Sequence, residues 1–199
     1  MARILIVLVF ILIWVFLLRV LRRAGLDFWH YLVGTIGMFI ILFVYVREPM
    51  TMPIARIVAL LASIPGKFGH LYEAYYKYGT IFIDSGGSAI SMQIDFECSG
   101  IIEIIAYISL LAFYKVYTIS ERVTLGMVGV MCIIISNAIR IAAICLIIYF
   151  AGTDMYFIAH TIIGRLIFYT LTVILYFYVF TKSQIVKQKV GAFGYDNNK

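Results

Sequence analysis

Long apolar runs without charged residues are the feature that most limits what this chain can fold into. They cover roughly residues 4–18, 28–46, 100–116, 123–150 and 155–180. About 20 apolar residues cross a bilayer as a helix. Only 13% of the residues are charged, against about a quarter in an ordinary soluble domain, so the polar surface is too small for a water-exposed globule. We therefore expect an all-α polytopic membrane protein with about five transmembrane helices.

Basic residues in the connections between these runs predict the orientation. They are Arg19, Arg22 and Arg23 after the first run, Lys115 and Arg122 beside the third connection, and Lys182, Lys187 and Lys189 after the last run. Short loops rich in lysine and arginine stay in the cytoplasm, so the loop Gly152–Asp154 is expected to face outward. These residues also account for the net charge of +6 without a nucleic-acid partner. The charges follow the first run and no small-residue cleavage site appears, which favours a retained span over a signal peptide.

The chain is expected to form a single membrane domain over residues 1–199. Its parts are two N-terminal spans (1–46), an extracytoplasmic or interfacial segment (47–99), a three-span core (100–181) and a cytoplasmic tail (182–199).

The outer segment contains two features of its own. Pro53–Pro65 is too short for a comfortable span and contains Arg56, which favours an interfacial or re-entrant helix. Ile81–Ile83 and Ala89–Phe96 flank the glycine-rich stretch Asp84–Ser88, which predicts a small β-hairpin before the third span.

Cys98 is the first candidate for chemistry, because Glu97-Cys98-Ser99-Gly100 stands where the hairpin meets the third span. A helix N-terminus lowers the pKa of a cysteine and favours the nucleophilic thiolate. The alternative is an unreactive residue at a boundary, and we assign Cys132 and Cys145 to that class. Three cysteines without CxxC spacing argue against a disulfide framework and against a thiolate metal site.

Asn137 and Arg140 are the second candidates, three residues apart and so on one face of the fourth span. A buried arginine costs roughly 2.5–3.5 kcal/mol on insertion scales, so it usually has a partner or a function. The structural alternative is an ion pair with Glu103, and the two roles can coexist.

His160 is the third candidate, less than two turns below the outer surface. Histidine suits proton transfer near neutral pH, although an interhelical hydrogen bond is an equally good reading of His160 alone. His30 lies on the wrong side, His70 is a reserve candidate, and Arg165 could have an auxiliary catalytic or a structural role.

Together, the thiol of Cys98, the imidazole of His160 and the guanidinium of Arg140 supply a nucleophile, a proton shuttle and an oxyanion stabiliser. These are the parts of a thiol acyl-transfer site. Such a site needs neither a metal nor a cofactor.

The same residues carry a family resemblance. Glu97-Cys98-Ser99-Gly100-Ile101, Asn137-Ala138-Ile139-Arg140, and His160 followed by Gly164 resemble the exosortase/archaeosortase family of membrane transpeptidases. Their order, their spacing over three consecutive spans and the preceding hairpin fit, over roughly residues 80–180. The small size is similar to that of the compact subgroup in Gram-positive bacteria.

The resemblance implies a role in the plasma membrane of a prokaryote, with the active site at the extracytoplasmic face. Substrates would be membrane-anchored proteins with a C-terminal sorting signal, made of a recognition motif, a transmembrane helix and a basic end. Cys98 would attack the scissile carbonyl, Arg140 would stabilise the oxyanion or the thiolate, and His160 would protonate the leaving amine. An amine, a lipid or glycan acceptor, or water would then release the product. Glu97, Ser99, Gly100, Glu103, Asn137 and Arg165 would support the site.

Two other functions stay open. A transporter or a scaffold for envelope polysaccharide or lipid assembly could use Glu103, Arg140 and Arg165 along a polar path. A cysteine-dependent acyltransferase could use Cys98 on a lipid instead of a protein. A scaffold should tolerate Cys98→Ser, whereas a thiol enzyme should not.

Overall fold

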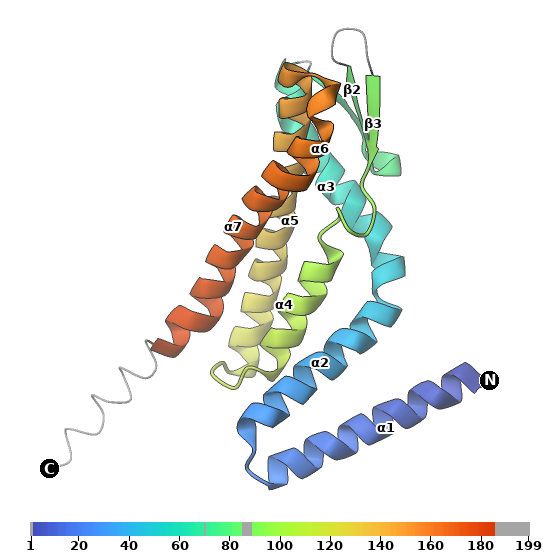
Figure 1. Ribbon diagram of the computed structural model, residues 1–199. Helices are drawn as coiled ribbons and strands as arrows, with labels where there is room; N and C mark the ends of the chain where they lie inside the picture. Colours follow the sequence, from blue (N-terminus) through green and yellow to red (C-terminus); the bar gives the residue numbers. More distant parts are fainter. Residues whose placement is uncertain (1, 70, 85–88, 186–199) are drawn as a thin grey trace, which may run out of the picture.

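The computed structural model describes residues 2–69, 71–84 and 89–185, and it is mostly helical with one small sheet (Figure 1). Within these residues, four helical stretches are long and apolar enough to cross a membrane: Asp27–Tyr45, Arg47–Gly69, Ile119–Ala151 and Thr153–Ile185. The predicted all-α polytopic membrane fold is confirmed. The differences concern the lengths of particular helices.

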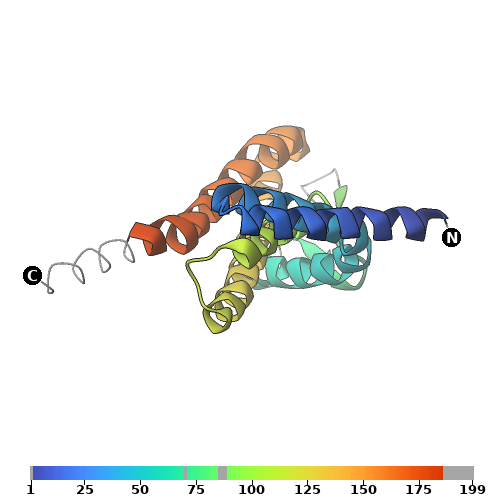
Figure 2. The ribbon, with the colours of Figure 1, turned by 90° about the horizontal axis from the view of Figure 1, so that it is seen from below.

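Helices α1 (Ala2–Arg23) and α2 (Asp27–Tyr45) are joined by a turn at Gly25, whose φ is +69°. Trp14 links them, because its indole N–H donates a hydrogen bond to the carbonyl of Val33 at 3.0 Å. A Cβ at Gly37 would lie only 2.0 Å from the indole nitrogen, so the helices can approach this closely only at a glycine. Seen from below, α1 crosses the lower end of the other helices (Figure 2).

Helix α3 (Arg47–Gly69) follows α2 after a single residue, Val46. It has 23 residues, so the predicted short helix over Pro53–Pro65 is wrong in its bounds, whereas its interfacial or re-entrant placement stays a prediction. Pro53 and Pro65, the expected boundaries, lie inside the helix. Its buried face packs on α5 and on the sheet, and most of the side chains there are small, among them Ala55, Ala59 and Ala62.

Helix α4 (Ile101–Phe113) is shorter than the predicted third span. Its 13 residues rise about 20 Å, less than the roughly 30 Å of bilayer hydrocarbon, so the helix is shorter than the apolar run over residues 100–116 predicts. The cause lies at both ends. Gly100 has a φ of +82°, which stops the helix from extending backward, and Thr118 begins the next helix through a capping box with Glu121.

Helix α5 (Ile119–Ala151) is the centre of the fold. Its 33 residues measure about 50 Å, and α3, α4 and α7 all pack against it. The last helical stretch turns back after Gly152 and varies in pitch. It consists of η2 (Thr153–Met155), α6 (Tyr156–Ile158), the π-helical η3 (Ala159–Ile163), α7 (Gly164–Tyr176) and the π-helical η4 (Phe177–Lys182). The two predicted spans over 123–150 and 155–180 are confirmed.

The sheet contains the predicted hairpin and one further strand. Strands β2 (Thr80–Asp84) and β3 (Ala89–Gln93) pair antiparallel, and residues 85–88 of the predicted glycine turn lie outside the described residues. Strand β1 (Glu73–Tyr75) was not predicted. It pairs antiparallel with β2, and the 3-10 turn η1 (Tyr76–Tyr78) connects the two strands. Ile81, Ile83 and Met92 are buried in a single apolar core with α3 and α5.

The connections that contain the basic residues gather at one end of the molecule. In Figure 1 the α1–α2 turn, the α4–α5 loop and the end of the last helix lie low, and the sheet lies high beside the α5–α6 turn. Lys115 of the α4–α5 loop forms an ion pair with Asp27 at the start of α2. These connections therefore lie at the end of the molecule opposite the sheet.

Candidate active site

Cys98 lies in a turn over residues 94–100, between β3 and α4, and Asp95 organises this turn. The Oδ1 atom of Asp95 accepts hydrogen bonds from the backbone N–H groups of Glu97 at 3.1 Å and Cys98 at 3.0 Å. An aspartate readily makes such bonds to the residues that follow it. Asp95 was not among the predicted site residues, although the Asp-x-Glu-Cys spacing is the signal that could have identified it.

The second half of the turn is held by Ser99. Its hydroxyl donates to the carbonyl of Phe96 at 3.2 Å and accepts from the N–H of Ile101 at 3.4 Å. Gly100 then takes a left-handed conformation, which any side chain would strain. Both predicted supporting residues therefore shape the backbone that presents Cys98.

Asn137 fixes the turn to α5. Its Nδ2 donates a hydrogen bond to the carbonyl of Cys98 at 2.6 Å, and its side chain is fully buried. A Cβ at Gly100 would lie 3.4 Å from the same nitrogen, at ordinary van der Waals distance, so Gly100 lies directly against Asn137. The predicted association of the Cys98 motif with the Asn137 motif is thus present as a direct contact.

His160 faces the Cys98 thiol. Its Nε2 lies 3.2 Å from Cys98 Sγ, and its ring stacks on Tyr156 with 5.6 Å between centroids. His160 belongs to the π-helical turn η3, and π turns inside helices are frequent at functional sites. Gly164 lets this turn approach α5, because a Cβ there would lie 2.7 Å from Ile144.

Arg140 is buried on α5, one turn from Asn137. Its side chain is 5% exposed, its guanidinium lies 5.8 Å from the ring centroid of Phe168, and its Nε has no hydrogen-bond partner. An ion pair with Glu103, the structural alternative, is absent from the described residues. Arg140 therefore keeps a positive charge and a free donor inside the protein.

Burial decides the protonation state of Cys98. The residue is 7% exposed, and burial raises the pKa of its thiol to about 11. The positive charge of Arg140 lowers this pKa by less than burial raises it, and the carboxylates of Asp95 and Glu97 raise it further. The prediction that the helix N-terminus lowers the Cys98 pKa is therefore wrong. The thiol is neutral at pH 7, so a nucleophilic reaction needs a base.

Three predicted supporting residues make few direct contacts in the site. Glu97 is exposed, Glu103 is partly buried on α4, and Arg165 is exposed on α7. The charge of Arg165 acts on His160 only through space, and Arg165 forms no ion pair within the described ranges.

The remaining candidates fall outside the site. His30 is on α2 beside Phe113, and His70 lies outside the described residues. Cys132 and Cys145 are free thiols on α5, of which Cys145 is fully buried. In the part of the chain that the structure describes, no three His, Cys, Asp or Glu side chains are grouped to hold a metal ion.

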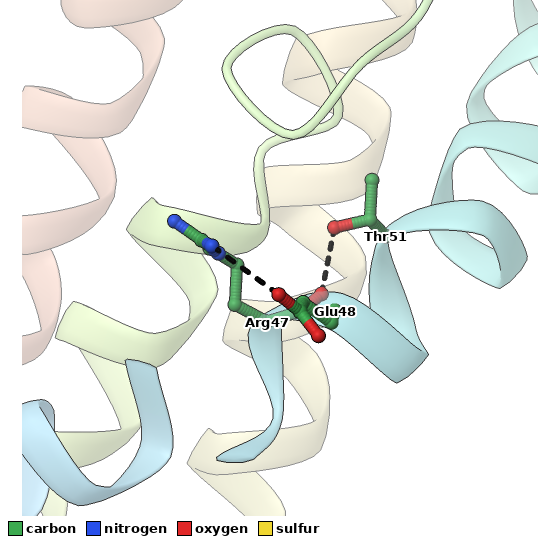
Figure 3. A network of polar contacts seen from close by, with 3 residues as sticks. All are labelled: Arg47, Glu48 and Thr51. Atoms are coloured by element: carbon green, nitrogen blue, oxygen red, sulfur yellow. Dashed lines mark hydrogen bonds and ion pairs between the residues drawn. The ribbon is translucent and has the colours of Figure 1, made fainter. Parts of the chain in front are cut away.

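Arg47 is a further contact of the turn that sequence reasoning missed. Its guanidinium carbon lies 4.8 Å from the ring centroid of Phe43 and 4.9 Å from that of Phe96, two residues before Cys98. Figure 3 shows Arg47 at the start of α3, with Glu48 at 3.7 Å and with Thr51 donating to its carbonyl at 2.6 Å. Arg47 thus connects the α2–α3 junction to the Cys98 turn. No spacing of residues in the sequence predicts this contact.

The chain matches a known protein family. The family model described as Transmembrane exosortase (Exosortase_EpsH) matches residues 1–177, a range that includes Cys98, Asn137, Arg140 and His160. No curated protein and no solved structure matches the chain. Because the family match extends over most of the sequence, this chain belongs to the transmembrane exosortase family.

Proposed function

We propose that this membrane protein is a cysteine transpeptidase that cleaves exported proteins at C-terminal sorting signals and transfers them to an acceptor. The observation that carries the proposal is the 3.2 Å between Cys98 Sγ and His160 Nε2, with the buried charge of Arg140 acting on the same thiol. A nucleophile within hydrogen-bond reach of a base is the arrangement that covalent catalysis requires.

The first step forms a thioester. His160 takes the Cys98 proton while Sγ attacks the peptide carbonyl, because a thiol with a pKa of about 11 is not ionised beforehand. The carbonyl oxygen becomes an oxyanion, which the Arg140 guanidinium stabilises. The C–N bond then breaks, His160 gives its proton to the leaving amine, and the exported part stays on Cys98.

The second step releases the product. An amine or another acceptor, such as a lipid or glycan nucleophile, attacks the thioester carbonyl and gives its proton to His160. The C–S bond breaks, and the Cys98 thiol regains a proton from His160. Water in place of the acceptor gives hydrolysis, which makes the enzyme a protease.

The depth of the site supports a reaction at the extracytoplasmic face of a prokaryotic plasma membrane. Asn137, which bonds to Cys98, is about 27 Å along α5 from Ile119 at the basic end. Hydrocarbon is about 30 Å thick, so Cys98 would lie near its outer boundary.

The substrate class rests on the family resemblance. It consists of membrane-anchored proteins with a short recognition motif, a transmembrane helix and a basic cytoplasmic end. A bond between the motif and the helix lies at the outer boundary of the hydrocarbon, at the depth proposed for Cys98.

The experiment is mass spectrometry of the C-termini of membrane and surface proteins from cells that carry the wild-type chain, Cys98→Ala or Cys98→Ser. Cys132→Ala is the matched control, because it removes a thiol of the same helix bundle that lies outside the site. We expect exported proteins with a C-terminal helix and basic end to keep their tails in the Cys98 variants only.

Two outcomes would contradict the proposal. If all C-termini are the same in wild-type and Cys98→Ala cells and the variant supports the cellular phenotype, a transporter or scaffold replaces the enzyme. If Cys98 is required but the change appears on a lipid, the chain is a lipid acyltransferase.

A further inference from the structure

The sheet has two unequal edges. Strand β1 has three residues and packs against α3, so its edge is short and covered. Strand β3 has five residues, and among the described elements only β2 lies extensively against it. In Figure 1, β3 lies on the side of the sheet away from α5 and α6.

The open edge of β3 has backbone groups to offer. The N–H of Ile94 donates to the carbonyl of Gly79 at 2.8 Å, which makes Gly79 and Ile94 a hydrogen-bonded pair. Bonded and non-bonded pairs alternate along an antiparallel ladder. Ile90 and Met92 therefore bond to β2, whereas residues 89, 91 and 93 turn their N–H and C=O groups toward the open edge.

The residues of this edge do not prevent another strand from pairing with it. Natural sheets usually blunt an exposed edge with charged residues, proline or a bulge. The strand Ala89-Ile90-Ser91-Met92-Gln93 has no charged residue and no proline, and its pairing with β2 is regular throughout. Ala89, Ser91 and Gln93 are exposed and small or polar. The edge is therefore suited to receive another strand.

The direction of β3 indicates which segment could add to this edge as a strand. β3 runs directly into the Asp95–Cys98 turn, so a segment beside β3 that continues in the same direction arrives at Cys98. The part of a substrate that ends in the attacked carbonyl must run N to C toward Cys98, which is parallel to β3.

We propose that the edge of β3 binds the extended segment of the sorted protein just before the cleaved bond, as an added parallel strand. The inference rests on the proposed function and names the surface that aligns its substrate. Backbone hydrogen bonds supply the affinity and alternate side chains the selectivity, as in other cases of strand addition.

The test compares Ser91→Pro with Ser91→Ala in cells, by pulse-chase of the proteins whose tails depend on Cys98. Proline removes the outward N–H of residue 91 and places a ring at the edge, whereas alanine keeps the N–H. We expect Ser91→Pro to slow processing at least tenfold and Ser91→Ala to stay within about twofold of wild type. Processing by Ser91→Pro at the wild-type rate would overturn the proposal.

If Ser91→Pro does not accumulate in the membrane, a second measurement tests the proposal. A photo-crosslinking residue replaces Gln93 in the Cys98→Ala chain, with the same reporter at the exposed Tyr76 of η1 as background. A crosslink at position 93 to the proteins that keep their tails supports the proposal. A crosslink only to a second copy of this chain, or none above background, overturns it. Failure of the function itself is distinct, since Cys98→Ala would then change no C-terminus.

Discussion

Two walls of the site, the Cys98 turn over residues 94–100 and helix α5, differ in how far their polar groups are hydrogen-bonded. In the Cys98 turn, Asp95 and Ser99 satisfy the backbone, and Asn137 closes the contact across to α5. On α5 itself, the Oδ1 of Asn137 and the Nε of Arg140 are buried without a hydrogen-bond partner.

This difference separates positioning from chemistry. These hydrogen bonds fix the backbone of the turn, so the thiol stays in reach of His160. Buried polar atoms without partners cost free energy, and proteins concentrate such costs at functional sites. On the proposed mechanism, the unpartnered Nε of Arg140 meets its partner only when negative charge develops on the substrate. Four predictions test this division.

The largest expected effect is the pH dependence of Cys98 alkylation. With a pKa raised to about 11, the thiolate fraction is roughly one in ten thousand at pH 7. Below the pKa that fraction grows with pH, so the iodoacetamide rate should rise about tenfold per unit between pH 7 and 10. The full chain with Cys132→Ala and Cys145→Ala, in lipid nanodiscs, reports on Cys98 alone. A rate that is already constant at pH 8 would mean that the charge on α5 outweighs burial.

Arg140→Gln removes the charge of the α5 wall and keeps a polar side chain. Loss of an oxyanion-stabilising group should lower the processing rate about 100- to 1,000-fold. Arg165→Gln is the matched control, because Arg165 is exposed on α7 and its charge acts on His160 without a direct contact. We expect less than about a threefold loss of processing rate. Equal losses in the two variants would place the charge of Arg165 in the site as well.

Asn137→Ala removes the hydrogen bond that joins the two walls. A buried carbonyl without its donor costs about 1–3 kcal/mol, so processing should fall roughly 5- to 150-fold. Ser109→Ala is the control, since its buried hydroxyl bonds only to Ile105 of its own helix. Processing by Asn137→Ala within about twofold of Ser109→Ala would show that the turn keeps its position without α5.

How far the sequence predicts the site depends on the kind of contact. Hydropathy and charge predicted α2, α5 and the last helical stretch but not the length of α3, and residue types in order gave Cys98, Asn137, Arg140 and His160 as candidates. The pKa of Cys98 was predicted in the wrong direction, because burial depends on how α5 and η3 lie against the turn. The length of α4 was missed for a similar reason. Hydropathy over residues 100–116 does not predict that the chain turns before Gly100 and after Phe113.

The smallest expected effect concerns Arg47, which supports the turn from outside. A guanidinium on an aromatic ring contributes about 0.5–1 kcal/mol when partly exposed, so Arg47→Ala should slow processing about two- to fivefold. Glu48→Ala should have almost no effect, because Glu48 is 82% exposed and surface ion pairs contribute little.

A double-mutant cycle with Phe96→Leu separates this contact from general destabilisation. If Arg47 acts through Phe96, the double variant should lose no more activity than the stronger single variant, because both changes remove one interaction. Additive losses would mean that Arg47 stabilises the α2–α3 junction through Phe43 alone. The bonded wall of the site would then end at Asp95, and the position of Cys98 would depend only on the turn itself and on Asn137.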